Sequence, residues 1–146
     1  MEELILSVDL GTTALKVGLF GRSGDLKALS TKEYELKTPK TDIVECNPET
    51  YWNAFKNAVN ELKDKYEHKP VEIKAVGISA QGETLFFLDE NGEPLRDAIV
   101  WMDNRAQKES KELTEEFTDE KCYEKTGQVS FDPAWPASKI LWSKKN

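Results

Sequence analysis

The sequence predicts a mixed α/β domain, on three observations. Residues 4–9 form an apolar run, and in residues 14–20 apolar residues alternate with others. Both patterns are typical of β-strands. Apolar residues then recur at helical spacing between Tyr51 and Tyr66. A compact apolar run at residues 73–79 follows that helix. Strands, a helix, more strands and finally helices make up a mixed α/β order.

Three antiparallel strands are predicted to open the fold. The first two occupy residues 4–9 and 14–20 and are joined by a tight turn. The third occupies about residues 26–36, after a turn over residues 21–25. Short turns between consecutive strands are typical of an antiparallel meander.

A long helix is predicted to follow the meander. Asn47 is typical of a helix N-cap, because Pro48 stands at the first helical position and Glu49 in the first turn. The apolar residues of this helix are predicted to face the core, and they are Tyr51, Trp52, Phe55, Val59, Leu62 and Tyr66.

Short strands and then helices are predicted for the second half. Residues 73–79 predict a buried strand beside the first, residues 84–89 a further strand, and residues 98–101 a short apolar segment. Asn91-Gly92 is a strong turn signal. Three helices are expected after these: one capped by Asp103 with Ala106, Ser110, Leu113 and Phe117 on one face, one over residues 119–127, and one from Pro136 with Ile140 and Leu141 inward.

The composition excludes several classes of function. The 146 residues fit one ordinary domain, and the 38% that are hydrophobic suffice for a packed core. The net charge of −7 argues against nucleic acid or an anionic membrane as the main partner, because both bind basic surfaces. A Cys/His metal site is not expected, because the chain has only two cysteines, Cys46 and Cys122, and one histidine, His68. With no signal peptide and no membrane-length segment, a cytoplasmic location is expected.

The turn between the first two strands carries groups suited to nucleotide phosphates. Gly11 allows a ligand close to the main chain, and Thr12 and Thr13 offer hydroxyl and N–H donors. Asp9 can hold a hydrated Mg²⁺, and Lys16 adds a cation nearby. Together these groups predict a site for the phosphates of Mg-ATP. The alternative is a plain hairpin turn with an Asp side-chain hydrogen bond.

Two later segments carry groups suited to a sugar or polyol. Gln81 and Glu83 follow the strand predicted at residues 73–79, where α/β sheets bind ligands, and their side chains can hydrogen-bond hydroxyl groups. Trp101 offers a flat apolar face to sugar C–H groups, with Asp103 close by. The alternatives are a polar β-turn at residues 81–83, a core tryptophan at Trp101 and a helix cap at Asp103.

Four segments in this order resemble the N-terminal part of the FGGY carbohydrate kinases, the group that includes glycerol kinase and xylulokinase. They are DLGTT, GISAQGET, AIVWMDNRA and TGQVSFDPAWPASKILW, and the resemblance covers nearly the whole chain. DxGTT alone is shared by the wider actin/hexokinase/Hsp70 superfamily, and the other three segments make the match specific. The resemblance implies a ribonuclease-H-like α/β fold, with a mixed sheet that opens with an antiparallel meander and is flanked by helices.

The resemblance also implies roles for single residues. Asp9 and the loop of Gly11, Thr12 and Thr13 would handle Mg²⁺ and the ATP phosphates, with Lys16 nearby. Glu83 and Trp101 match substrate-binding residues of the glycerol kinase type. Glycerol kinases have Gln-Arg-Glu and xylulokinases Gln-Met-His where this chain has Gln-Gly-Glu at residues 81–83. The substrate is therefore left open among polyols and ketoses.

By the same resemblance, residues 1–146 are a partial N-terminal kinase domain, incomplete at its carboxyl end. The family's general-base aspartate and adenine pocket lie beyond the matched region, so this piece alone is expected to be weak or inactive. The expected partners are a sugar or polyol, the remainder of the kinase chain, and a second copy bound through Ile140, Leu141 and Trp142. The alternatives are a non-catalytic sugar- or phosphate-binding module and an actin-like or Hsp70-like ATPase half.

Overall fold

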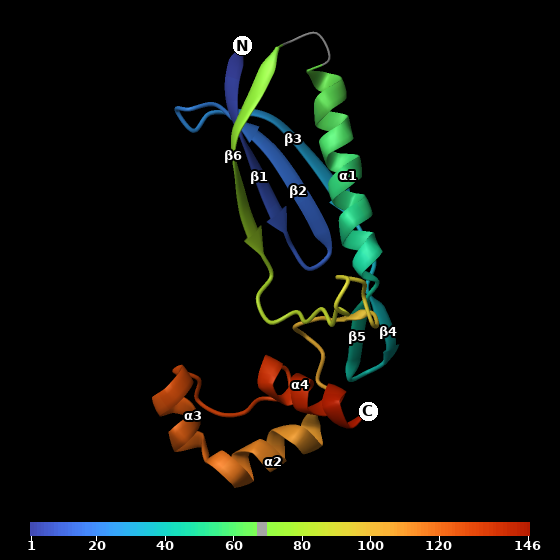
Figure 1. Ribbon diagram of the computed structural model, residues 1–146, viewed down its shortest axis with the longest axis vertical. Helices are drawn as coiled ribbons and strands as arrows, with labels where there is room; N and C mark the ends of the chain where they lie inside the picture. Colours follow the sequence, from blue (N-terminus) through green and yellow to red (C-terminus); the bar gives the residue numbers. More distant parts are fainter. Residues whose placement is uncertain (67–69) are drawn as a thin grey trace. The chain divides into compact units, whose positions relative to one another are not determined.

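The computed structural model describes residues 1–66 and 70–146, which form two compact units (Figure 1). The first unit comprises Met1–Glu35 and Asn47–Gln81, and the second comprises Leu36–Cys46 and Gly82–Asn146. His68, the one histidine of the chain, lies outside the described residues. The predicted mixed α/β class is confirmed.

The first unit is a mixed sheet with a long helix. β1 (Glu2–Leu10), β2 (Ala14–Phe20) and β3 (Leu26–Glu33) form the predicted antiparallel meander. β6 (Val71–Ala80) pairs in parallel with β1, so the strand order is β3-β2-β1-β6. Parallel neighbours need a crossover connection, and α1 (Pro48–Lys65) lies within it.

The long helix begins as predicted and, except at Trp52, turns the predicted face to the core. The side chain of the N-cap residue Asn47 accepts a hydrogen bond from the Glu49 N–H. α1 lies against β2 and β3 (Figure 1), and Ala54 and Ala58 are among its buried residues. The prediction that Trp52 faces the core is wrong, because its side chain is 53% exposed. Small alanine side chains instead let the helix approach the sheet closely.

The prediction that residues 73–79 form a buried strand is right about the strand and wrong about its burial. Ile73, Val76 and Ile78 pair with Leu4, Leu6 and Val8 of β1, so all three lie on the side of the sheet that carries α1. They are 43%, 56% and 73% exposed, because α1 covers β2 and β3 rather than β6. A hollow of about 330 Å³, lined in part by Val76, Ile78, Trp52 and Phe55, separates the helix from this strand.

The second unit contains a small sheet and helices. β4 (Lys37–Lys40), β5 (Ile43–Cys46) and β7 (Ala98–Ile99) form an antiparallel sheet in the order β4-β5-β7. β4 and β5 were not predicted, because each has only four residues and β4 contains a proline and no apolar pattern. The strand predicted at residues 84–89 is instead an irregular segment with two isolated bridges, Leu85 to Ile99 and Leu88 to Pro94. The turn at Asn91-Gly92 is confirmed, with Gly92 at φ +83°.

The three predicted helices are present, with two corrections. They are α2 (Gln107–Phe117), α3 (Asp119–Thr126) and α4 (Pro136–Lys145). The predicted cap by Asp103 is wrong, since the N-cap position of α2 is Ala106 and no side chain caps it. Ile140 was expected to point inward, but it is 52% exposed and α4 buries Ser138 and Lys139 instead.

Two further observations concern the chain's chemistry. Cys46 and Cys122 are both buried and unbridged. Within the described residues, no helix combines the length and the apolar character that crossing a bilayer requires.

Candidate functional site

The predicted phosphate loop lies at the edge of the first unit's sheet where two parallel strands end. β1 and β6 run in the same direction, with Asp9 opposite Ser79 and Leu10 opposite Ala80. The Gln81 N–H donates to the Leu10 carbonyl over 2.9 Å, so the segments that leave the two strands are held side by side. In α/β sheets, ligands bind outside the carboxyl ends of parallel strands. The structure thus brings Asp9, its loop and Gln81 to one such edge.

Gly11 is required by the turn itself. Its N–H donates to the Ala14 carbonyl over 3.0 Å. A Cβ atom at Gly11 would lie 2.8 Å from that same oxygen, so a larger residue would force the main chain to shift. A role of Gly11 in close approach to a ligand stays a prediction.

Two tyrosines that no sequence motif indicates as site residues support this loop. The Tyr34 hydroxyl donates to the Gly11 carbonyl over 2.5 Å, and the Tyr34 N–H donates to the Thr13 carbonyl over 3.0 Å. The Tyr34 ring packs edge-to-face against Tyr51 of α1, with 5.1 Å between ring centroids. Tyr34 therefore fixes two carbonyls of the loop's main chain. The local sequence around this tyrosine, just after β3, does not indicate this role.

The charged groups of the loop fit a hydrated Mg²⁺ and phosphate oxygens. The Asp9 carboxylate lies 3.6 Å from the Lys16 ammonium across the hairpin, and each side chain is about half-exposed. Thr12 is half-buried and Thr13 exposed. Among the residues that the structure describes, no three His, Cys, Asp or Glu side chains form a metal cluster. A single carboxylate is compatible with Mg²⁺, since that ion keeps several waters and takes one or two carboxylates plus phosphate oxygens, and Asp9 stays the predicted ligand.

Gln81 is half-buried and only partly satisfied. Its amide nitrogen Nε2 donates to the Tyr51 hydroxyl over 3.3 Å. Its amide oxygen Oε1 is buried and accepts no hydrogen bond within the described residues. An unsatisfied buried acceptor costs about 1–3 kcal/mol, so a donor from a ligand or from water would stabilise this position.

Glu83 and Trp101 lie in the second unit, on neighbouring segments. Leu85 and Ile99 exchange two main-chain hydrogen bonds of 2.9 and 3.0 Å, and the Trp101 N–H donates to the Thr84 hydroxyl over 3.1 Å. Glu83 has φ +63°, which is uncommon for a residue with a Cβ atom and often marks functional positions. Trp101 is 41% exposed. The structure therefore brings these two sequence-predicted residues to adjacent segments.

Asp103 is fully buried and its carboxylate is occupied by protein donors. Oδ2 accepts the Val44 N–H over 2.7 Å, and both oxygens accept hydrogen bonds from the Arg105 guanidinium at 2.7 to 3.0 Å. Arg105 also contacts Glu45 at 2.8 Å, and its side chain is 5% exposed. Burial by itself lowers the pKa of Arg105, but the hydrogen bonds to Asp103 and Glu45 outweigh burial and raise it. Asp103 is therefore not part of the substrate-binding set proposed below.

Glu83 lines a small apolar cavity of about 120 Å³. The other residues in its wall are Cys122, Thr126, Gln128, Phe131, Trp135, Pro136, Ala137 and Ser138. The Ser138 hydroxyl is fully buried and has no hydrogen-bond partner within the described residues. Trp135 belongs to the last of the four sequence segments, and the structure places it in the same cavity wall as Glu83.

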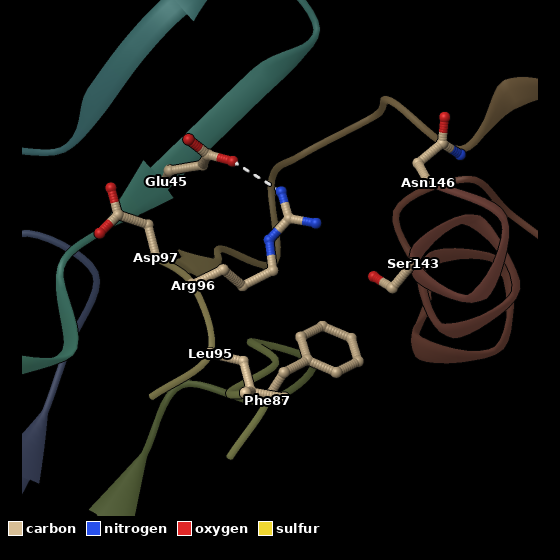
Figure 2. Close-up of a pocket in the computed structure, with 7 residues that line it drawn as sticks. All are labelled: Glu45, Phe87, Leu95, Arg96, Asp97, Ser143 and Asn146. Carbon is tan, nitrogen blue, oxygen red and sulfur yellow. Dashed lines mark hydrogen bonds and ion pairs between the residues drawn. The ribbon is translucent and has the colours of Figure 1, made fainter. Parts of the chain in front are cut away.

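A larger hollow of about 480 Å³ lies beside Arg96 in the second unit (Figure 2). The Arg96 guanidinium bonds to the Glu45 carboxylate at 3.3 Å and lies 4.9 Å from the centre of the Trp142 ring. The wall consists of Glu45, Phe87, Leu95, Arg96, Asp97, Ser143 and Asn146, and it contains none of the residues predicted to bind substrate.

The chain is similar to known kinases over its whole length. Residues 4–146 match the sequence model of the N-terminal domain of the FGGY family of carbohydrate kinases. A glycerol kinase of Thermococcus gammatolerans is 35% identical over 146 residues, which are 100% of this chain and 29% of that protein. Solved structures of a Plasmodium falciparum glycerol kinase with ADP (TM-score 0.93, 30% identity) and of a ligand-bound xylulose kinase from Lactobacillus acidophilus (TM-score 0.88, 29% identity) each align with 99% of this chain and with 29% of their own.

These similarities confirm the fold class that the resemblance implied. The structural neighbours are sugar and polyol kinases with the actin/hexokinase-like fold. The chain spans about 29% of the length of the relatives it matches.

Proposed function

Because the chain belongs to the FGGY family of carbohydrate kinases, we propose that it provides part of the substrate-binding cleft of an enzyme that transfers the γ-phosphoryl group of ATP to a hydroxyl of a polyol or ketose. The observation that carries this proposal is the juxtaposition of the Asp9 loop and Gln81 at the carboxyl ends of β1 and β6. Phosphoryl transfer depends on positioning and on neutralising charge, and this edge offers groups for both.

The loop residues have distinct roles in this proposal. Asp9 would hold a hydrated Mg²⁺ ion, and the donors of Thr12 and Thr13 and the Lys16 ammonium would bind phosphate oxygens, while Gly11, whose N–H is used by the Ala14 carbonyl, would let the phosphates approach the main chain. Mg-ATP, when bound, supplies the phosphoryl group. Tyr34 keeps the loop's main chain in place through its bonds to Gly11 and Thr13, so the phosphate-binding groups need not be ordered by the ligand.

Gln81, Glu83 and Trp101 bind the acceptor in this proposal. The open acceptor of Gln81 and the carboxylate of Glu83 take hydrogen bonds from hydroxyl groups, and the exposed part of the Trp101 ring packs on C–H groups. This chain has Gly82 where glycerol kinases have an arginine that binds the polyol. We therefore propose that the acceptor is a polyol or a ketose, without naming one compound. The general base is proposed to lie in a further segment of the kinase, since Asp103 is buried and already bonded to Arg105 and Val44.

A coupled assay of ADP release from Mg-ATP tests this proposal, with glycerol, D-xylulose and D-gluconate as acceptors. On this chain alone we expect sugar-dependent turnover to be weak or absent, with binding of the acceptor detectable by calorimetry. Binding of nucleotide without any acceptor binding would favour an ATPase half instead. Binding of an acceptor with no nucleotide binding would favour a non-catalytic sugar-binding module.

Self-association is a further expectation, and we propose a different interface for it than the end of α4. Only Ile140 of the three residues expected at the interface is more than half-exposed, since Leu141 is half-buried and Trp142 is stacked on Arg105 and Arg96. The apolar row of Ile73, Val76 and Ile78 on the edge strand β6 exposes more apolar surface. Exposed edge strands pair readily with another chain.

We predict that the chain forms dimers or larger species through β6, and that Ile78→Lys restores a monomer. A lysine on an edge strand opposes pairing because its charge would be buried. Light scattering after gel filtration measures this, with Val129→Lys, at a valine that is 72% exposed in the second unit, as the matched control. A monomeric wild-type chain at high concentration would contradict the prediction, and a monomer produced by Ile140→Lys alone would return the interface to α4.

A further inference from the structure

Lys139 is a buried lysine that the proposed function does not use. It lies on α4 and is 0% exposed. Its ammonium group donates to the Val100 carbonyl over 3.0 Å and to the Trp101 carbonyl over 3.1 Å. Lysine is almost never fully buried unless its charge is paired, so this placement calls for an explanation.

The lysine holds the segment that carries Trp101. The Trp101 main chain is bound on one side by the Thr84 hydroxyl, one residue after Glu83, and on the other by the Lys139 ammonium. The Asp103 N–H closes a turn onto the Val100 carbonyl, which is the second acceptor of Lys139. One side chain of α4 therefore fixes two consecutive carbonyls directly beside the tryptophan.

Four charged groups on three segments surround Lys139. Asp103, Glu83 and Asp132 stabilise its charged form, and Arg105 opposes it. Burial has the largest effect and lowers the pKa of Lys139 to about 8, from an ordinary value of 10.5. Of the three carboxylates, Asp103 is bonded to Arg105 and Val44, and Asp132 accepts the Ala134 N–H at 2.7 Å.

We propose that Lys139 is a positioning residue for acceptor binding: by holding the carbonyls of Val100 and Trp101, it sets the orientation of the Trp101 ring beside the Glu83 segment. This inference rests on the proposed role of Trp101 and Glu83. A charged ammonium offers three donors and strong hydrogen bonds, whereas the neutral amine offers two donors and weaker bonds. Loss of the proton therefore loosens the segment without removing any group that would touch the acceptor.

The contact can be tested without any acceptor by fluorine NMR of the 146-residue chain labelled with 5-fluorotryptophan. Trp101→Phe assigns the Trp101 resonance among the four tryptophans of the chain. In the wild-type chain we expect this resonance to shift with pH, with a midpoint of about 8, because burial lowers the pKa of Lys139 to about that value. Lys139→Met should abolish the shift, and Lys144→Met, at an exposed lysine of the same helix, should keep it. A Trp101 resonance that does not titrate in the wild-type chain overturns the proposal, and this measurement needs no variant that might fail to fold.

Stability provides a second readout with a defined sign. The folded-state pKa of Lys139 is lower than its ordinary value, so the unfolded chain binds this proton more tightly than the folded chain. The free energy of unfolding of the wild-type chain should therefore rise, relative to Lys139→Met, as the pH goes from about 8 to about 10.5. If the free energies of unfolding of wild type and Lys139→Met change in parallel over this pH range, the lowered pKa of Lys139 is overturned.

Binding of glycerol and D-xylulose separates this inference from the proposed function. If both hold, Lys139→Met weakens acceptor binding about tenfold, and wild-type binding weakens as the pH rises through about 8. If the Trp101 resonance titrates but the wild-type chain binds neither acceptor, the contact stands and the acceptor role of Trp101 fails. If Lys139→Met folds and binds the acceptor as tightly as wild type, Lys139 has no positioning role.

Discussion

Replacing Asp103 with alanine is expected to lower the free energy of unfolding by about 3–5 kcal/mol, the cost of breaking a buried ion pair from one side. The substitution leaves the Arg105 guanidinium buried, with Glu45 as its remaining partner at 2.8 Å. It also leaves the Val44 N–H without its acceptor. Urea denaturation at neutral pH, followed by tryptophan fluorescence, measures the change.

Asp97→Ala is the matched control for this prediction. Asp97 also pairs with a cation of the second unit, Lys37, at 2.5 Å, but both side chains are partly exposed, at 26% and 56%. Exposed pairs contribute at most about 1 kcal/mol, so this change should be small. Equal losses for Asp97→Ala and Asp103→Ala would contradict the structural role of the buried cluster. If Asp103→Ala does not fold, Asp103→Asn keeps the volume and should still cost more than the control.

Asp9→Asn is expected to weaken Mg²⁺-dependent ADP binding about 100-fold, because a metal held at phosphate oxygens contributes several kcal/mol. Calorimetry should be run with Mg²⁺ and again with EDTA. Since Asp9 acts through the ion in this proposal, wild type and variant should differ in the first condition and agree in the second. The variant should fold normally, because the Asp9–Lys16 pair is about half-exposed.

Asp25→Asn serves as the control for the nucleotide experiment. Asp25 also pairs with a lysine, Lys27, at 2.8 Å, and it lies near the turn between β2 and β3, away from the loop of Asp9. Its substitution should leave ADP binding unchanged. A wild-type affinity for ADP that does not depend on Mg²⁺, or an Asp9→Asn chain that binds Mg-ADP as wild type does, would remove Asp9 from the metal site.

Part of the candidate site can be predicted from the sequence. Asp9, Gly11 and Gln81 stand next to strands whose patterns are clear, so their meeting at one edge follows once β1 and β6 are parallel neighbours. The sequence does not predict the roles of Tyr34 and Lys139, since a tyrosine after a strand and a lysine in a helix have many ordinary explanations. Their roles depend on acceptors distant in the chain: Tyr34 is 23 residues from Gly11, and Lys139 is 38 from Trp101.

The sequence by itself determined the features that depend on neighbouring residues. These are the α/β class, the opening meander, the cap of α1 at Asn47 and, through its four motifs, the kinase family. Such features follow from local hydrogen bonding, turn chemistry and hydrophobic periodicity.

Only the tertiary structure decided which residues are buried and which charges are paired. Trp52 is exposed while Ala58 is buried, and β6 is left uncovered beside α1. The sequence predicts a helix cap or a sugar ligand at Asp103, yet this carboxylate accepts the N–H of Val44, 59 residues away. The burial of a side chain and the pairing of a buried charge depend on which segments lie next to each other in space. A local sequence pattern does not specify those long-range contacts.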